Sequence, residues 1–340
     1  MKIRFAGATD VGQVRTNNED NFAVLTDRNL MVVCDGMGGH AAGEVASGIA
    51  AETIVTLFAE HDLKVFTSER FVYPEEITPE GKLLVGAIAV ANTRIHDRSR
   101  SHPELAGMGT TVVACQFKDG VVSICHAGDS RGYLMREGSL KQITIDHSLL
   151  NELMEKYPAQ EEESKNFVNA NVITRALGTK PSIKVDISEI AFKEGDLFLL
   201  CSDGLSGMVT DSQLLETVSA HPDNPDQLIT ALIDLANAAG GADNITVCVA
   251  RIDEQKQVDE FEEVRRVTLH WGEGPEADDI HQIADSKFDS DAVSSPGTSD
   301  AVTDVSPPTA KKKSVRIWSY LLIVIILALL VILGRIIGVF

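Results

Sequence analysis

The chain has 340 residues, of which 44% are hydrophobic, so it is long enough for one large domain or two ordinary ones with a sizeable core. Lys and Arg total 30 against 50 Asp and Glu, and a formal net charge of -20 argues against binding to nucleic acid phosphates. The five cysteines are widely spaced in apolar runs, which is typical of reduced core residues and argues against a structural zinc site.

The N-terminus has no apolar core of the length that a secretory signal requires, so we expect the bulk of the chain to fold in the cytoplasm. Up to about Ile252, short β-branched runs alternate with longer helix-compatible stretches and Gly-rich turns, which predicts mixed α and β structure. The expected strands are 31–34, 121–126, 197–201 and 245–251. The expected helices are 44–60, 82–98, 213–219 and 225–239.

The composition changes after Ile252. Residues 253–316 are rich in acidic residues, Ser, Thr and Pro, and end in a basic stretch. This composition predicts a flexible linker, because it buries too little apolar surface to offset the entropy of ordering. Within it, an amphipathic piece at 264–271, which contains Trp271, is the one candidate for docking.

The last part of the chain, residues 317–337, is predicted to span a membrane. Residues 317–333 contain only Ser319 as a polar residue, and such a run is near the minimum length for a bilayer core of roughly 30 Å. The alternative is a buried core helix. The positive-inside rule places the preceding side in the cytoplasm, and the residues concerned are Lys311, Lys312, Lys313 and Arg316.

Acidic residues follow or precede apolar strands at four places. Asp35 and Asp203 directly end apolar runs, in LMVVCDGMGG and LFLLCSDGLSG. Asp129 follows another run in VVSICHAGDSRG, and Asp243 begins one in GGADNITVCVARI. A single Asp-Gly is usually a turn, but clustered carboxylates repel one another unless cations neutralise them. The pattern therefore indicates a site for hard cations such as Mg²⁺ or Mn²⁺.

The segment VGQVRTNNEDNFAV adds three more candidate residues near the N-terminus, Arg15, Glu19 and Asp20. The planar guanidinium of Arg15 suits a phosphate dianion, and Glu19 offers another carboxylate for a metal. Taken alone, an Arg four residues before a Glu is most often a solvated pair, so their weight comes from the other motifs.

The order of these motifs resembles the type 2C (PPM) metal-dependent protein phosphatase family in its bacterial form. The resemblance covers roughly residues 6–252, and its motifs are VRTNNED, VVCDGMGGHAAGEVAS, GMGTT, HAGDSRGYL, DHSLLNEL, NVITRALGT, CSDGLSGMV and GGADNITVCVARI. It implies an α+β fold for a catalytic domain at 1–252, a four-layer αββα sandwich of two antiparallel sheets flanked by helices.

The resemblance also implies roles for the acidic residues. Asp35 would bridge two Mn²⁺ or Mg²⁺ ions, with the carbonyl of Gly36 on one of them. Asp203 and Asp243 would serve the other ion, and Glu19 would reach the site through water.

Three further roles follow from the same resemblance. Asp129 matches a carboxylate that, with Asp203, holds a third and weaker metal in bacterial relatives. Arg15 would clamp the substrate phosphate, and Asp20 would orient the attacking water.

The leaving oxygen needs a proton donor, and His40 is the nearest candidate. Here the chain departs from the eukaryotic branch, where a His directly follows Asp-Gly, because Met37 stands at that position. Protonation by water and a structural role for His40 both remain open. His126 and His147 are interpreted as structural.

Two segments differ from many bacterial members. Residues 146–171 fall where the family carries a mobile flap beside the active site, and they are longer and more acidic. Residues 61–79 look like an insertion, for which a plain surface loop is the simplest interpretation.

The expected function is hydrolysis of phosphoserine and phosphothreonine by a two-metal activated water, at the cytoplasmic face of a membrane and opposing a Ser/Thr kinase. One alternative is an inactive, membrane-tethered module that binds phosphoproteins. A second is a regulator acting on a phosphorylated anti-sigma antagonist, although no sensory domain is recognisable. A third is a Cys-based tyrosine phosphatase loop, suggested by the spacing of Cys125 and Arg131.

Overall fold

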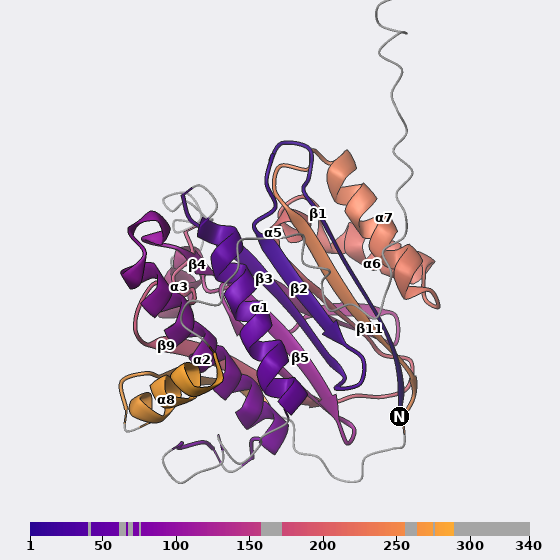
Figure 1. Cartoon of the computed structure of the whole chain (residues 1–340). Coiled ribbons are helices and arrows are strands. Elements are labelled where there is room, and N and C mark those ends of the chain that lie inside the picture. Colours follow the sequence, from indigo (N-terminus) through magenta and orange to yellow (C-terminus); the bar gives the residue numbers. More distant parts are fainter. Residues whose placement is uncertain are drawn as a thin grey trace, which may run out of the picture. The chain divides into compact units, whose positions relative to one another are not determined.

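The computed structural model describes residues 1–39, 42–60, 66, 71–74, 76–157, 172–255, 264–274 and 276–288. The strands form two antiparallel sheets (Figure 1). The smaller sheet has five strands in the order β1-β11-β10-β7-β8. Their bounds are Lys2–Asp10 (β1), Ile245–Glu254 (β11), Leu197–Cys201 (β10), Arg131–Arg136 (β7) and Ser139–Gln142 (β8).

The larger sheet has the strand order β12-β9-β6-β5-β3-β2, and a short strand β4 pairs with β3. The bounds of these strands are Val264–Trp271 (β12), Ile183–Ala191 (β9), Val121–Ala127 (β6), Val112–Lys118 (β5), Leu30–Met37 (β3), Asp20–Leu25 (β2) and Gly109–Thr110 (β4). All of the expected strands are confirmed within these bounds.

Helices cover the outer faces of both sheets (Figure 1). The helices α1 (Ala42–Glu60) and α2 (Pro79–Ser101) pack on the larger sheet, and α6 (Asp211–Ala220) and α7 (Pro225–Ala238) lie on the side of the smaller one. Three buried hydrophobic clusters fill the three interfaces, so the predicted sandwich is confirmed. The remaining helices are η2 (Pro103–Leu105), α3 (Leu149–Lys156), α5 (Asp203–Ser206) and α8 (Ala277–Lys287).

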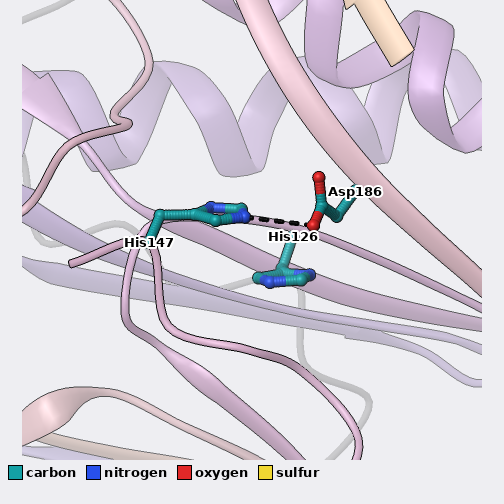
Figure 2. Close-up of side chains that lie close together, drawn as sticks. All are labelled: His126, His147 and Asp186. Atoms are coloured by element: carbon teal, nitrogen blue, oxygen red, sulfur yellow. Dashed lines mark ion pairs between the residues drawn. The ribbon is translucent and has the colours of Figure 1, made fainter. Parts of the chain in front are cut away.

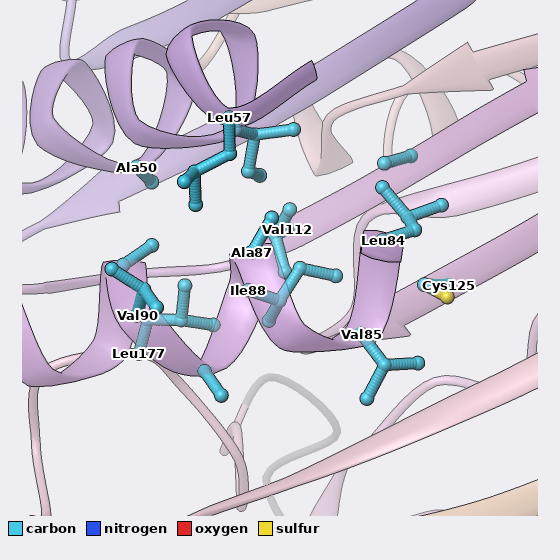
Figure 3. Close-up of a cluster of buried hydrophobic side chains, with 14 of the residues drawn as sticks. Ala50, Leu57, Leu84, Val85, Ala87, Ile88, Val90, Val112, Cys125 and Leu177 are labelled. Carbon is cyan, nitrogen blue, oxygen red and sulfur yellow. The ribbon is translucent and has the colours of Figure 1, made fainter. Parts of the chain in front are cut away.

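The outer core between α1, α2 and the larger sheet is built from small and branched apolar residues (Figure 3). Ala50 and Leu57 of α1 lie across from Ala87 and Ile88 of α2, and none of these side chains is more than 3% exposed. Burying a Leu or Ile side chain contributes about 1.5–3 kcal/mol. This packing fixes α1 against β3, the strand that carries Asp35.

The flexible linker predicted from residue 253 onward is wrong for residues 264–274 and 276–288. β12 pairs with β9 and α8 packs against α2. Trp271 is 3% exposed, and α8 buries Ile280 and Ile283. The docking expected of the amphipathic piece at 264–271 is confirmed, because this piece is β12. The linker composition is an average over a long stretch, and it hides the second segment, α8.

The interpretation of residues 61–79 as a plain surface loop is also wrong where the structure describes them. Phe66 and Phe71 are 1% and 5% exposed. The ring of Trp271 lies 5.4 Å from that of Phe71 and 5.2 Å from that of Tyr73. Gly86 of α2 has no side chain to block Phe66, whose ring carbon would lie 2.3 Å from an added Cβ. The insertion and the C-terminal extension therefore share one aromatic cluster.

The predicted membrane span at 317–337 lies outside the described residues. Among the residues that are described, only α1 is long and apolar enough to cross a membrane, and 61% of its most apolar window is buried inside the fold. Because α1 packs between α2 and β3, we assign it to the core.

Candidate active site

The strand-end acids predicted from the sequence meet at one end of the sandwich. Asp203 begins α5 directly after β10, and its carboxyl lies within hydrogen-bonding distance of that of Asp35 in β3. Asp129 and Asp243 lie near enough that their charges act on Asp35 as well. Elements far apart in sequence therefore bring these carboxylates together, as the motif spacing predicts.

The cluster contains more negative charge than its surroundings neutralise. Burial, followed by the charges of Asp20 and Asp203, raises the pKa of Asp35 well above its usual value. Burial and the charge of Asp203 raise the pKa of Asp129 to about 6, and the Oδ1 atom of Asp129 is buried without a hydrogen-bond partner. Burial followed by Asp243 also raises the pKa of Asp203. Oxygen-rich, under-neutralised sites of this kind fit divalent Mg²⁺ or Mn²⁺.

Asp20 lies beside this cluster because β2 and β3 place it directly opposite Asp35. Its Oδ2 accepts a hydrogen bond from Thr246 Oγ1 at 2.6 Å, and the Ser202 hydroxyl lies close enough to lower its pKa as well. Burial nevertheless raises the pKa of Asp20 to about 7, since these contacts only partly offset desolvation. Asp20 is therefore poised to hold or release a proton near neutral pH.

The loop between β1 and β2 carries the predicted basic and acidic pair. Arg15 donates to Asp243 Oδ2 at 2.8 Å, and the charge of Asp243 raises the pKa of Arg15. The Arg15 side chain is 52% exposed, so its guanidinium also reaches solvent at the rim of the cluster. Burial raises the pKa of Glu19.

Gly36 lies where the chain passes closest to the β1–β2 loop. Its amide donates to Glu19 O at 3.1 Å. An added Cβ would lie 2.4 Å from that oxygen and 2.2 Å from Gly43 O, so no larger residue fits without moving the backbone. This close contact holds Glu19 next to the end of β3.

The polar residues that hold these acids in place were not predicted from the sequence. Asn244 accepts from the amide of Glu19 at 2.8 Å and donates to Asn17 O at 2.9 Å. Thr111 joins two of the acidic loops, because its backbone and side chain bond to Asp35 and its hydroxyl bonds to Ser130 at 2.7 Å. Both residues lie inside quoted motifs, GGADN and GMGTT; Asn244 directly follows Asp243 and could have been identified by that position, whereas Thr111 has no acid beside it in the sequence.

The predicted general acid, His40, lies outside the described residues. The structure therefore leaves its role as an expectation. Met37, which occupies the position of the eukaryotic His, is the last residue of β3 and pairs with Gly109.

A second buried cluster, formed by His126, His147 and Asp186, also offers metal-ligating atoms within 4.8 Å of one another. The rings of His126 and His147 stack 4.5 Å apart, and His147 Nε2 lies 3.3 Å from Asp186 Oδ2 (Figure 2). His147 Nδ1 accepts from the amide of Gly128, so Nε2 carries the proton and points at Asp186. Arg175 also donates to Asp186 at 2.7 Å. The guanidinium of Arg175 neutralises the carboxylate without a metal, in agreement with a structural role.

The geometry contradicts the Cys-based tyrosine phosphatase alternative. Cys125 lies inside β6, and burial raises the pKa of its thiol well above the usual value. Arg131 donates to both carboxylate oxygens of Asp146 at 3.0 Å or less. A thiolate and a free guanidinium are therefore not brought to one phosphate site.

A shallow pocket of about 350 Å³ lies at the other end of the smaller sheet. Its lining includes Met135, which pairs with Leu197 at the start of β10, whereas the acids gather at the end of that strand. Arg136 and Asp196 in its wall form an ion pair at 2.7 Å. The pocket is therefore separate from the carboxylate cluster.

Comparison with known proteins agrees with this geometry. A family model described as Protein phosphatase 2C matches residues 12–240. The chain is 37% identical over 251 residues to the serine/threonine phosphatase stp of Listeria monocytogenes, covering 72% of this chain and 94% of that relative. It is 36% identical over 257 residues to the serine/threonine protein phosphatase PstP of Mycobacterium tuberculosis, covering 74% of this chain and 45% of that relative.

Solved structures show the same similarity. The crystal structure of the Mycobacterium tuberculosis phosphatase PstP/Ppp has a TM-score of 0.64 and 35% identity, covering 74% of this chain and 99% of that one. The catalytic domain of PstP in complex with two manganese ions has a TM-score of 0.62 and 34% identity, with the same coverage. The chain therefore belongs to the protein phosphatase 2C family of enzymes.

Proposed function

We propose that this chain hydrolyses phosphoserine and phosphothreonine in proteins with the help of Mn²⁺ or Mg²⁺. The observation that carries the proposal is the buried cluster around Asp35, whose carboxylates have raised pKa values and too few cationic partners. The relatives named as serine/threonine phosphatases, one of them with two manganese ions, support the same substrate class and metal.

In this proposal, Asp35, Gly36, Asp203 and Asp243 hold two ions, Glu19 acts through water, and Asp129 with Asp203 offers a third position. Bound ions of this kind supply an activated water and neutralise charge that develops on the phosphoryl oxygens. The protein contributes a rigid mount, because each acid lies at the end or start of a buried strand.

Two further side chains act directly on the reacting groups. Arg15, which is half-exposed and adjoins Asp243, binds two phosphate oxygens and orients phosphorus for in-line attack. Asp20 accepts a hydrogen bond from Thr246 at Oδ2, and in this proposal its Oδ1 orients the attacking water. The proton donor to the leaving oxygen is His40 or water.

The experiment is hydrolysis of a phosphothreonine peptide by the full chain with Mn²⁺, with EDTA, and with Asp203→Asn. The proposal expects activity that requires Mn²⁺ and is lost in the variant. A folded, Mn²⁺-binding chain without activity would instead identify a module that binds phosphoproteins without cleaving them. Arg100→Met, an exposed change on α2, is the matched control and keeps full activity.

We also propose that the chain is anchored in a membrane through residues 317–337, with the catalytic domain in the cytoplasm, where it opposes a Ser/Thr kinase. The long apolar run and the adjacent lysines support the anchor. Tethering raises the effective concentration of the enzyme for substrates at the same membrane.

The anchor is tested by flotation with liposomes. The full chain should float, and a chain ending at residue 288, which keeps every described element, should remain in solution. Equal behaviour of both forms would contradict the anchor and leave the phosphatase proposal untouched. In cells, the shortened chain should keep activity on soluble phosphopeptides and lose it on membrane-bound kinase targets.

A further inference from the structure

Asp186 of β9 lies at a junction between two parts of the chain. Thr268 of β12 donates to its Oδ1 at 2.7 Å, and Arg266 Nε of β12 lies 3.7 Å from its Oδ2. From the side opposite β12, His147 and Arg175 contact the same carboxylate. Asp186 is 1% exposed, so these charged contacts are made inside the protein.

His147 and Arg175 are close to the two ends of one segment, whose ends are tied together. Leu149 N donates to Val172 O and Thr174 N donates to His147 O, both at 2.8 Å. The segment includes α3, which begins directly after the Ser148 cap. Contacts to Asp186 therefore anchor both ends of the segment that contains α3.

This anchor adjoins the active site through His147. The amide of His147 donates to Gly128 O at 2.9 Å, and the amide of Gly128 donates to His147 Nδ1 at 3.0 Å. The next residue, Asp129, belongs to the carboxylate cluster. The base of the α3 segment and the Asp129 loop are thus parts of one hydrogen-bonded unit.

Arg266 connects β12 to α3 as well as to Asp186. Its NH2 atom donates to Glu155 Oε1 at 2.9 Å, while its Nε faces Asp186. None of the described residues of α3 is buried, so a few surface contacts set the position of this helix. One side chain from the C-terminal extension therefore bridges the sheet and a helix that has little packing of its own.

We propose that Arg266 is a positioning residue for the phosphatase reaction: β12 holds α3 beside the Asp129 loop, and α3 guides the substrate polypeptide at the rim of the site. β12 lies beyond residues 12–240, the part matched by the family model, so this control belongs to the extension. The proposal expects the effect on protein and peptide substrates and not on a small phosphoester, because only a polypeptide is long enough to extend from the acids to α3.

The test compares the full chain in detergent micelles with Arg266→Met, Arg266→Lys, Glu155→Gln and the double variant Arg266→Met/Glu155→Gln. Hydrogen exchange of α3 amides should become about two- to fivefold faster in Arg266→Met and in Glu155→Gln, as loss of a half-exposed ion pair predicts. The exchange rate of α3 in the double variant should rise no more than in Arg266→Met alone, because the two side chains share one interaction. The exchange rate in Arg266→Lys should lie between those of wild type and Arg266→Met, since Lys keeps the positive charge but lacks the planar guanidinium that contacts two acids at once.

The kinetic measurement rests on the proposed function, whereas the exchange measurement does not. In Arg266→Met, the KM for a phosphothreonine peptide should rise about two- to fivefold, with kcat and the rate on p-nitrophenyl phosphate nearly unchanged. Arg100→Met, an exposed Arg on α2, should leave both measurements at wild-type values. The Glu155 side chain is 70% exposed, so Glu155→Gln keeps the fold intact.

The proposal would be overturned if the α3 amides exchanged at the wild-type rate in both single variants. It would also be overturned if Arg266→Met lost activity equally on the peptide and on the small phosphoester. An inactive wild-type chain with faster α3 exchange in the variants would refute the proposed function and leave the positioning of α3 by β12 standing.

Discussion

The carboxylate cluster around Asp35 and the junction at Asp186 are both built around a buried aspartate, yet their electrostatics are opposite. Around Asp35, burial and neighbouring acids raise pKa values. At Asp186, burial alone would raise the pKa, but hydrogen bonds from His147 and Thr268 lower it below its usual value. The first site lacks positive charge, and the second already has it from Arg175 and Arg266.

The difference shows how a metal site is distinguished from a structural ion network in the same fold. Clusters of ligand-type atoms occur in both places, and by proximity of His and Asp alone the Asp186 junction is the stronger candidate. Counting the charges and protons on each ligand reverses that ranking, because a cation gains little beside an acid that two arginines already neutralise.

The largest expected effect is on catalysis. Asp35→Asn removes the acid at the centre of the cluster and should lower kcat/KM on a phosphothreonine peptide by roughly a thousandfold or more, about 4 kcal/mol of transition-state stabilisation. Without metal, the variant should unfold at the same or a higher temperature than wild type, because one repelling carboxylate is gone. Retention of Mn²⁺-dependent activity would contradict the assignment of Asp35.

The next effect is on stability. Asp186→Asn should lower the free energy of unfolding by about 2 kcal/mol, since the partly exposed Arg175 and Arg266 lose the charge of their buried acid. The variant should still require Mn²⁺ for activity, and the Mn²⁺ concentration that it requires should be the same as for wild type. Asp253→Asn, which breaks the ion pair with the part-exposed Arg4, is the control and should cost less than about 1 kcal/mol in urea unfolding. A lost metal requirement in Asp186→Asn would remove the contrast between the two sites.

A smaller effect concerns pH. Asp20 and Asp129 have folded pKa values of about 7 and 6, above their usual range, so in EDTA they stabilise the fold at acidic pH and this contribution is lost as pH rises towards 7. Cations favour the ionised acids, so the gain in Tm from Mn²⁺ should be roughly 4 °C larger at pH 7.5 than at pH 5. Burial lowers the pKa of His126 to about 4, an opposite trend that cancels in the difference between the two conditions. A gain independent of pH would mean that the acids are ionised without metal.

Modification or replacement of Cys125 is expected to have no effect on activity. Cys125 lies in β6 beside the strand of Asp186, and burial raises the pKa of its thiol. Alkylation of the native chain with iodoacetamide should leave activity unchanged, and Cys125→Ala should retain it. Rapid inactivation that substrate prevents would revive a thiol mechanism.

The acids of the carboxylate cluster could be predicted from the sequence because each signal is local. An apolar run that is interrupted by Asp35, or that ends just before Asp203, is visible within ten residues, and burial of the strand places the acid near its end. The arrangement of the two sheets came from the resemblance to a family, because the strand periodicity does not define pairing.

The Asp186 junction could not be predicted, because its parts are single polar residues on separate strands and loops. Asp186 lies opposite His126 on one side and opposite Thr268 on the other, and only the registers of β6, β9 and β12 show this. The sequence marked residues 264–271 only as an amphipathic piece that could dock, and not as the strand β12. Tertiary pairing, and not local preference, orders this part of the chain.

The position of β12 at the end of the larger sheet also determines how shortened forms of the chain would behave. A chain cut after Ile252 would leave β9 as the outer strand, with the hydrogen-bonding groups of its nine residues open along one side. Open edges of this kind pair readily with a second copy of the same strand. Self-association of such a fragment would therefore report the missing strand and not the assembly state of the intact enzyme.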